Sequence, residues 1–416
     1  MNVNSLIFKK LIKKTPVKIA GSSMLPLFGK DNIVYFDSIN KRRLQINDIV
    51  FVKKSKDFFV HRIIYKNSDY FITRGDNNLK SDGKIKHNQI IAKVKKIKKG
   101  KNTYTPENIY LLQSAYYFKE ILKIKKLFEM NNVSYVFLKG LPLHLYFEGN
   151  HPRRLYADCD VLIGKKDFDK AKKILSQSGY ENNNTSFSPI QRKLKDKVTE
   201  SSFFKIINGI PVVFDIHLEP VFLMTQIGSL NALYPQNLIN RLTIALLETK
   251  REIIINDEKF FILNSKFLIL YLALHFFHHN FCGAFRLDFL DKVIRKSHLK
   301  KQGWINIKTT VDDYSLENFV KPVFFLLKKY YSTPVPDFML TKGRSAFGRN
   351  FNNLDIFSDK PRFETGVNRF KNIFFLSPRP FIIKLLVFFD PQVIYLVFFV
   401  LKKKLSRFLK AVLENH

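Results

Sequence analysis

The sequence predicts a multidomain chain with an N-terminal all-β region, an α/β (α+β) region with a helical C-terminal part, and a final helical, apolar segment. Its length of 416 residues suits about two to three domains. Near residue 109 the hydrophobic pattern changes from short β-type runs to helical spacing, and strand-like and helix-like runs then alternate. The expected boundaries are 1–100, 109–330 and 331–416.

Residues 1–100 contain β-branched and aromatic runs separated by Asn, Asp, Gly and Lys, a pattern typical of strands and turns. In chain order the runs are NIVYFDSI, NDIVFVKK, FFVHRIIYK and DYFITRGD. Residues 93–108 are rich in lysine and include Gly100 and Pro106, which indicates a basic linker.

From residue 109 the apolar spacing of three and four predicts an amphipathic helix as far as about residue 132. The runs that follow alternate between strand and helix: VSYVFLKG, LPLHLYFEG, ADCDVLIG, KDFDKAKKILSQSGY and IPVVFDIHLE. Beyond about residue 240 we expect mainly helices, in SKFLILYLALHFFHH, FRLDFLDKVIRK and SLENFVKPVFFLLKKYY.

The formal net charge of +35 raises the possibility of a nucleic-acid or anionic-membrane partner. The lysines and arginines are spread through the chain, however, and no nucleic-acid motif accompanies them. The sequence therefore favours an enzyme over a protein that binds nucleic acid or anionic membrane. Two cysteines, Cys159 and Cys282, form neither a disulfide framework nor a metal set. They suit a reducing compartment, and we expect a cytoplasmic protein.

Both ends of the chain were considered as membrane segments. The basic N-terminal stretch has an apolar run too short for a signal peptide or a span. Residues 381–405 are strongly apolar, but Lys384, Asp390 and Pro391 interrupt them. We expect two short helices broken at Pro391, which pack on the protein body or make peripheral contact with a membrane surface.

Four short blocks follow one another in the N-terminal region: GSSMLP (21–26), NDIV (47–50), VHRII (60–64) and TRGDNN (73–78), the last followed by Asp82. A serine that hydrolyses a peptide bond needs a base and donors for the developing oxyanion, which a sheet can bring together. Together the blocks resemble the signal peptidase and LexA-type serine peptidases, with Asn47 in place of that family's glycine.

The resemblance implies a peptidase acting on a peptide or protein leader, with Ser23 as nucleophile, His61 as general base and Asp82 orienting the imidazole. Residues expected to support the oxyanion or the turn are Gly21, Ser22, Gly75 and Asp76, with Gly75 and Asn77 at positive φ. Gly21 stands where many signal peptidases carry an assisting hydroxyl, and we find no N-terminal anchor.

Several alternatives to a serine–histidine peptidase stay open. Lys53 or Lys54 could be the base if burial lowered its pKa. Ser23 could be an ordinary turn or helix-cap residue. The whole region could be a catalytically degenerate module that binds extended peptide by strand addition.

The run ADCDVLI places Asp158 and Asp160 two residues apart, so both carboxylates face one side of a strand. Asp215 in VVFDIHLE adds a third carboxylate from an expected neighbouring strand. Three carboxylates can hold Mg²⁺ and align a nucleoside triphosphate (NTP). Gly140, at a strand-to-helix junction, allows a phosphate to approach the backbone.

These residues lie in a pattern of L-K-G, R…D-x-D, D-x-H and a later H…H with a tryptophan. The pattern resembles the uncharacterised minimal nucleotidyltransferase family related to polymerase-β-type enzymes. The resemblance implies nucleotide contacts at Lys139, Gly140, Arg154 and His217, and it includes His275, His279 and Trp304. Lys-Gly replaces the usual Gly-Ser of the superfamily, and Lys139 could contact phosphate as a point charge. The sequence thus predicts a serine peptidase fused to a magnesium-dependent nucleotidyltransferase.

Overall fold

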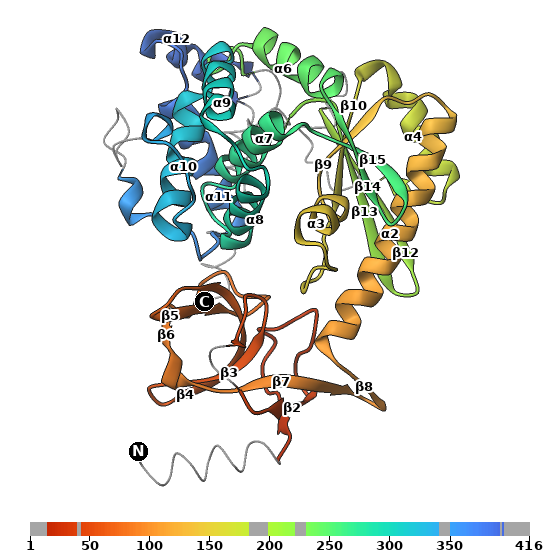
Figure 1. Cartoon of the computed structure of the whole chain (residues 1–416), viewed down its shortest axis with the longest axis vertical. Coiled ribbons are helices and arrows are strands. Elements are labelled where there is room, and N and C mark those ends of the chain that lie inside the picture. Colours follow the sequence, from red (N-terminus) through yellow and green to blue (C-terminus); the bar gives the residue numbers. More distant parts are fainter. Residues whose placement is uncertain are drawn as a thin grey trace, which may run out of the picture.

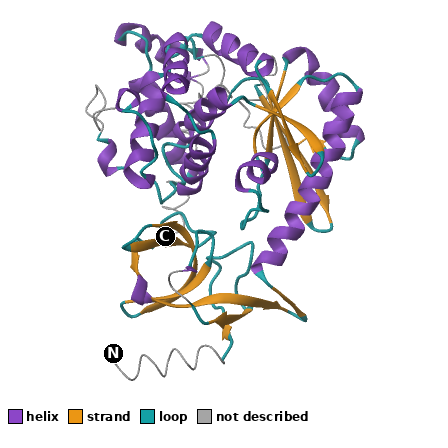
Figure 2. Cartoon of the chain, in the orientation of Figure 1, coloured by secondary structure: helices purple, strands orange, loops and turns teal. Residues whose placement is uncertain are grey.

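Figure 1 shows the computed structural model of the chain, which describes residues 15–39, 43–182, 199–220, 230–340, 350–391 and 393–394. An antiparallel β region lies at one end of the molecule. The long helix α2 (Pro106–Met130) leads from it to a mixed sheet, and a group of helices lies beside that sheet (Figures 1 and 2). The N-terminal basic stretch up to residue 14 and residues 395–405 lie outside the described residues.

The N-terminal sheet is antiparallel and has the strand order β1-β2-β7-β3-β4-β5-β6, with β8 paired to β7. Its strands are β1 (Val17–Lys18), β2 (Ile33–Asp37), β3 (Ile49–Lys54), β4 (Asp57–Lys66), β5 (Tyr70–Arg74), β6 (Lys84–Lys86), β7 (Ile90–Lys99) and β8 (Asn102–Tyr104). All four predicted strand runs are present.

Strand β4 positions side chains for two different places in the molecule. Successive residues of a strand point to opposite faces. His61 and Arg62 are both buried, but their side chains have entirely different partners. His61 contacts Ser23 and Asp82, whereas Arg62 contacts Asp76 and Tyr110 on the other side.

The prediction of a linker over 93–108 is wrong. Residues up to Lys99 belong to β7, which pairs with both β2 and β3, and α2 begins at Pro106 after the N-cap Thr105. Val94 and Ile97 are buried while most of the lysines between and after them stay partly or fully exposed. The exposed lysines of β7 therefore made one strand of the sheet look like a charged linker.

The mixed sheet has the order β11-β12-β13-β10-β9-β15-β14, in which β10–β13 and β9–β15 are parallel pairs. Its strands are β9 (Tyr135–Lys139), β10 (Cys159–Ile163), β11 (Glu181–Asn182), β12 (Glu200–Ile207), β13 (Ile210–His217), β14 (Arg251–Ile255) and β15 (Glu258–Ile262). The predicted strands β9, β10 and β13 are its three central neighbours.

The helices after α2 are α3 (Leu141–Glu148), α4 (Phe168–Gln177), α6 (Gln236–Glu248), α7 (Ser265–His278), α8 (Ala284–Lys296), α9 (Lys301–Asp313), α10 (Glu317–Tyr331), α11 (Arg362–Leu376) and α12 (Phe381–Leu385). Short 3₁₀ turns are η2 (His87–Gln89), η3 (Lys165–Asp167), η7 (Asp337–Met339), η8 (Phe351–Asn353) and η9 (Leu386–Phe389). Helix α7 is apolar all round and is buried from Phe267 to His278, so it forms the centre of the helical group. Trp304 packs against Phe324 in this core, as expected.

The region beyond residue 240 is mainly helical, as expected, but it also contains the hairpin β14–β15, which completes the mixed sheet beside β9. Its turn residues Asn256 and Asp257 both have positive φ, at 49° and 63°. That backbone matches the right-handed twist of a two-residue hairpin. The Asn-Asp pair between two apolar runs was a sequence signal for this hairpin that the helical reading passed over.

The apolar C-terminal stretch begins as expected with a short helix, α12, followed directly by the 3₁₀ turn η9. Residues 391 and 393–394 are helical, so a break falls at Asp390. In the part of the chain that the structure describes, no helix combines the length and hydrophobicity needed to cross a bilayer.

Candidate active sites

Three aspartates converge where the start of β10 lies beside the last residues of β13. Parallel pairing of β10 with β13 puts Asp160 directly beside Asp215, and Asp158 precedes β10 by one residue. One ligand atom from each carboxylate lies within 4.8 Å of the others. Cys159, between the first two, is fully buried in the core, as strand alternation predicts.

Two basic side chains from neighbouring strands contact this cluster. Lys139 at the end of β9 places Nζ 2.7 Å from Asp160 Oδ2 and 3.1 Å from Asp158 Oδ2. His217 at the end of β13 places Nε2 2.8 Å from Asp160 Oδ1. We expected the Lys139 ammonium to contact a phosphate, and in the structure it lies between the carboxylates of Asp158 and Asp160. His217 forms a hydrogen bond with Asp160.

The cluster separates its carboxylates by pKa. Burial and the charge of Asp160 raise the pKa of Asp215 to about 7. Burial would also raise the pKa of Asp160, but Lys139 and His217 outweigh burial and lower it. The pKa of His217 is raised, because its contacts with acidic groups outweigh burial. Asp215 therefore ionises less readily than Asp160, whose charge Lys139 and His217 stabilise.

The donor set fits magnesium. It consists of carboxylate oxygens only, which is the ligand type that Mg²⁺ prefers. Burial and the charge of Asp160 raise the pKa of Asp215, so a bound cation would favour its ionised form. Asp158, Asp160 and Asp215 are the residues that would hold the ion.

Gly140 and Arg154 lie beside the carboxylates. Gly140 is the N-cap of α3 with φ 105°, and a Cβ there would lie 3.4 Å from the Cα of Cys159. The position therefore favours glycine both for its backbone and for its close packing. Arg154 Nη2 lies 3.1 Å from His144 Nε2, and burial lowers the pKa of His144 to about 4. Neutral His144 can accept this hydrogen bond.

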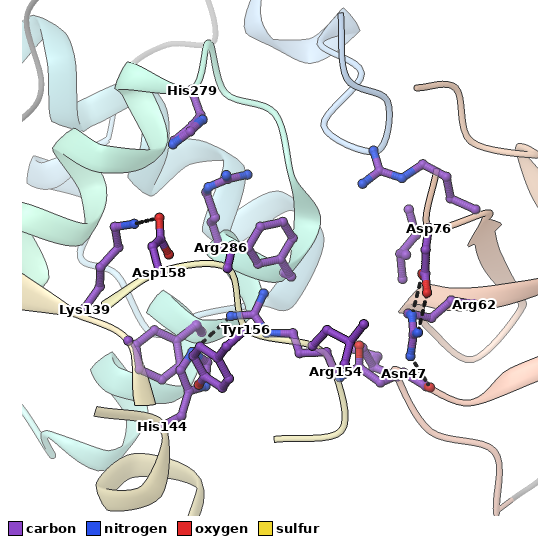
Figure 3. A pocket seen from close by; sticks show the side chains of 18 of the residues that line it. Asn47, Arg62, Asp76, Lys139, His144, Arg154, Tyr156, Asp158, His279 and Arg286 are labelled. Carbon is purple, nitrogen blue, oxygen red and sulfur yellow. Dashed lines mark hydrogen bonds and ion pairs between the residues drawn. The ribbon is translucent and has the colours of Figure 1, made fainter. Parts of the chain in front are cut away.

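A cavity of about 500 Å³ opens between the β region and the α/β region (Figure 3). The α/β side contributes Lys139, Gly140, Arg154, Tyr156, Asp158, His275, His279, Phe285 and Arg286, among others. The β side contributes Asn47, Arg62, Arg74 and Asp76. In Figure 3 the Arg62–Asp76 pair lies across the cavity from the Lys139–Asp158 pair. Four predicted nucleotide or metal residues thus face one space: Lys139, Gly140, Arg154 and Asp158.

In the N-terminal region Ser23, His61 and Asp82 form a continuous hydrogen-bonded chain. His61 Nε2 lies 3.0 Å from Ser23 Oγ, and His61 Nδ1 lies 2.8 Å from Asp82 Oδ2. Thr73 Oγ1 donates to the same Asp82 oxygen at 2.7 Å. A hydroxyl, an imidazole and a carboxylate from three separate segments therefore meet at one place, which is the arrangement that activates a serine.

The turn after β5 holds the Ser23 backbone. Asn77 N donates to the Ser23 carbonyl at 2.8 Å, and Gly75 packs so closely that a Cβ would lie 2.6 Å from that oxygen. Neither Gly75 nor Asn77 has the positive φ predicted from the turn pattern. Close packing on Ser23 explains why residue 75 is a glycine. Asn47, which replaces a glycine, does have a positive φ of 74°.

The other predicted support residues divide between the two sites. Gly21 and Ser22 are exposed beside Ser23, and the Ser22 carbonyl accepts from Asn77 Nδ2 at 3.4 Å. Asp76 does not face Ser23. Its carboxylate forms a bidentate pair with Arg62 at 2.7 and 2.5 Å and lines the cavity, because neighbouring residues of the turn point in opposite directions.

The two lysines considered as bases lie elsewhere. Lys53 Nζ lies over the ring of Phe58, and Lys54 Nζ contacts the backbone carbonyl of Asp82. The group within hydrogen-bond reach of Ser23 Oγ is His61. Lys54 instead fixes the segment that carries Asp82.

Sequence reasoning missed several residues that build these sites. Thr73 belongs to the TRGDNN block, but its contact with Asp82, nine residues later, has no local sequence signal. Arg62, Arg74, His144 and Arg286 reach the cavity only through tertiary packing. No local pattern marks them.

Comparison with known proteins bears on the α/β region. Residues 109–332 match the family described as uncharacterised nucleotidyltransferase, and this match covers more than half of the chain. The match begins after the β region. No curated protein and no solved structure matches the chain. With its strand-borne aspartates inside the matched residues, the chain belongs to this family of uncharacterised nucleotidyltransferases.

Proposed function

We propose that the chain transfers a nucleotidyl group from a nucleoside triphosphate in a magnesium-dependent reaction. The observation that carries this proposal is the cluster of Asp158, Asp160 and Asp215 within the family-matched residues, with Asp158 lining the cavity. Magnesium held there would neutralise the phosphate chain and polarise the reacting oxygens. Nucleotidyl transfer needs little else from a protein than positioning and charge.

The chain's own residues divide the remaining work. Lys139 and His217 hold Asp160 in one orientation through contacts of 2.7 and 2.8 Å. Asp215, which accepts a hydrogen bond from Ser202, would hold the metal together with Asp158 and Asp160. Gly140 leaves the backbone at the start of α3 open to a phosphate oxygen.

The test is release of pyrophosphate from each of the four nucleoside triphosphates, with the label followed from the α-phosphate. We expect release that requires Mg²⁺ and stops when EDTA removes the metal. Calcium, which binds carboxylates with looser geometry, should support binding but much slower turnover. Pyrophosphate release that is equal with Mg²⁺ and with EDTA would contradict the proposal.

A second activity is proposed for the β region, because the hydrogen-bonded chain Ser23–His61–Asp82 specifically favours it. We propose a serine-type peptidase of the signal peptidase kind that acts on a peptide or protein leader. Ser23 Oγ attacks the scissile carbonyl, and His61 Nε2 takes the hydroxyl proton and passes it to the departing amine. Asp82 accepts the Nδ1–H hydrogen bond and so keeps Nε2 free to act as base.

A fluorophosphonate probe tests this activity, since it reacts with activated serines and needs no knowledge of the substrate. We expect covalent labelling of the tryptic peptide that contains residue 23. Ser23→Ala should abolish labelling, whereas Ser22→Ala, one residue away, should retain it. Absence of labelling in the folded wild-type chain would favour a peptide-binding module without catalysis.

A further inference from the structure

We propose that Arg154 and Arg286 form a clamp for the phosphate chain of the nucleoside triphosphate in the cavity between the two regions. This inference rests on the proposed nucleotidyl transfer and specifies which groups hold its substrate. Arg154 comes from the segment before β10 and Arg286 from the first turn of α8. Both side chains line the cavity that Asp158 and Lys139 also line (Figure 3).

The two guanidinium groups share one aromatic side chain. The Cζ atoms of Arg154 and Arg286 lie 4.5 and 4.4 Å from the centroid of the Phe285 ring. Their hydrogen bonds are to neutral groups: Arg154 to His144 Nε2 at 3.1 Å, and Arg286 to the Cys282 carbonyl at 3.5 Å. Within the described part of the chain, neither forms an ion pair with a carboxylate.

The other arginines of the cavity are treated differently. Arg62 is neutralised by its bidentate pair with Asp76, and Arg74 lies 2.9 Å from Asp359. Burying a cation without a counter-charge costs free energy, and a cavity wall is where a ligand can supply that charge. Of the four arginines that line the cavity, Arg154 and Arg286 are therefore the two that can pair with a bound anion.

The electrostatics of Arg286 agree with this view. Burial, together with the nearby charge of Arg154, lowers the pKa of Arg286 to about 10 against the opposing influence of Asp359 and Asp158. A bound polyanion would relieve both the desolvation and the repulsion between the two arginines. Arginine offers phosphate two parallel N–H donors, which makes paired arginines well suited to a chain of phosphates.

Position favours phosphate over other anions. Lys139, which also lines this wall, already forms ion pairs with Asp158 and Asp160. A phosphate chain on the two arginines would lie in the same cavity as Asp158, which belongs to the metal cluster. The triphosphate of the substrate is the polyanion that has to reach this place for transfer to occur.

The test measures binding of tripolyphosphate, ATP and adenosine by calorimetry to the full chain, with EDTA present so that no metal contributes. Arg154→Gln and Arg286→Gln should each weaken tripolyphosphate and ATP binding about 10- to 100-fold. Adenosine binding should not change. Arg241→Gln is the matched control, because Arg241 stacks on Tyr314 from α6 and does not line the cavity.

Arg286→Lys guards against misfolding, since it keeps the charge and loses only the planar fork, and thermal melts of every variant confirm the fold. Unchanged tripolyphosphate binding in folded Arg154→Gln and Arg286→Gln proteins would overturn the clamp, as would tighter binding of citrate than of tripolyphosphate. A wild-type chain that binds tripolyphosphate through the arginines but releases no pyrophosphate with Mg²⁺ would support the clamp and contradict the transferase.

Discussion

Replacing Asp215 by asparagine is expected to abolish magnesium-dependent pyrophosphate release and, at the same time, to stabilise the metal-free protein at pH 8 by about 2 kcal/mol. The pKa of Asp215 is raised to about 7 by burial and by Asp160, from the ordinary value of 3.8. One pKa unit corresponds to about 1.4 kcal/mol, and relaxation around a partly buried group reduces the full figure. Asparagine keeps the shape and the acceptor for Ser202 without the charge.

The pH dependence follows from the direction of that shift. The folded state binds the Asp215 proton more tightly than the unfolded state, so wild-type stability falls as pH rises from about 4 to about 7. The destabilisation is complete above the folded-state pKa and absent below the unfolded one. Urea unfolding at pH 4 and pH 8 should therefore show the two proteins converging at the lower pH.

Asp160→Asn provides a control of opposite sign. The pKa of Asp160 is lowered, because Lys139 and His217 outweigh its burial, and Asp160→Asn removes the charge that both buried basic groups contact, although Lys139 keeps Asp158. We expect a loss of about 2–4 kcal/mol at pH 8, together with loss of transfer. Destabilisation of both variants by similar amounts would contradict the electrostatic account of the cluster.

Replacing His61 by alanine is expected to slow fluorophosphonate labelling of Ser23 by a factor on the order of 10³ to 10⁴. The reason is geometric: His61 Nε2 is the basic group 3.0 Å from Ser23 Oγ, and without it the hydroxyl keeps its proton. Asp82→Asn should also slow labelling, because an amide no longer selects the tautomer with Nδ1–H.

His87→Ala is the matched control for that experiment. His87 belongs to the same sheet region but is exposed and contacts Phe71 and the Ser68 carbonyl, away from Ser23. The labelling rate is followed by gel fluorescence over time, with near-ultraviolet circular dichroism to verify folding. If His61→Ala were labelled as fast as His87→Ala, the imidazole would have no part in activating Ser23.

Both clusters could be predicted from the sequence, for different reasons. Asp158 and Asp160 followed from strand alternation, and Asp215 needed only the assumption that its strand is a neighbour, which the register Asp160–Asp215 confirms. Ser23, His61 and Asp82 came from motif order alone, since nothing local indicates that these distant positions meet. The roles of these residues stay predictions.

Residues on the far walls of the cavity could not be predicted. Arg286 lies on α8, whose position depends on packing against α7, α10 and α3, and an arginine in AFRLDFL looks like any solvated helix residue. The Arg62–Asp76 pair was hidden for another reason. Each residue sits next to one used by the Ser23 cluster, and alternation sends it to the opposite side.

The neighbouring positions His61 and Arg62 on β4 have a kinetic consequence. Because successive residues of a strand point to opposite faces, we expect a molecule released beside the imidazole to leave into bulk solvent before it reaches the guanidinium side. The rate of the reaction at either site should then not depend on whether the other site is occupied. A reporter substrate in large excess should outcompete any intermediate that one site releases for the other.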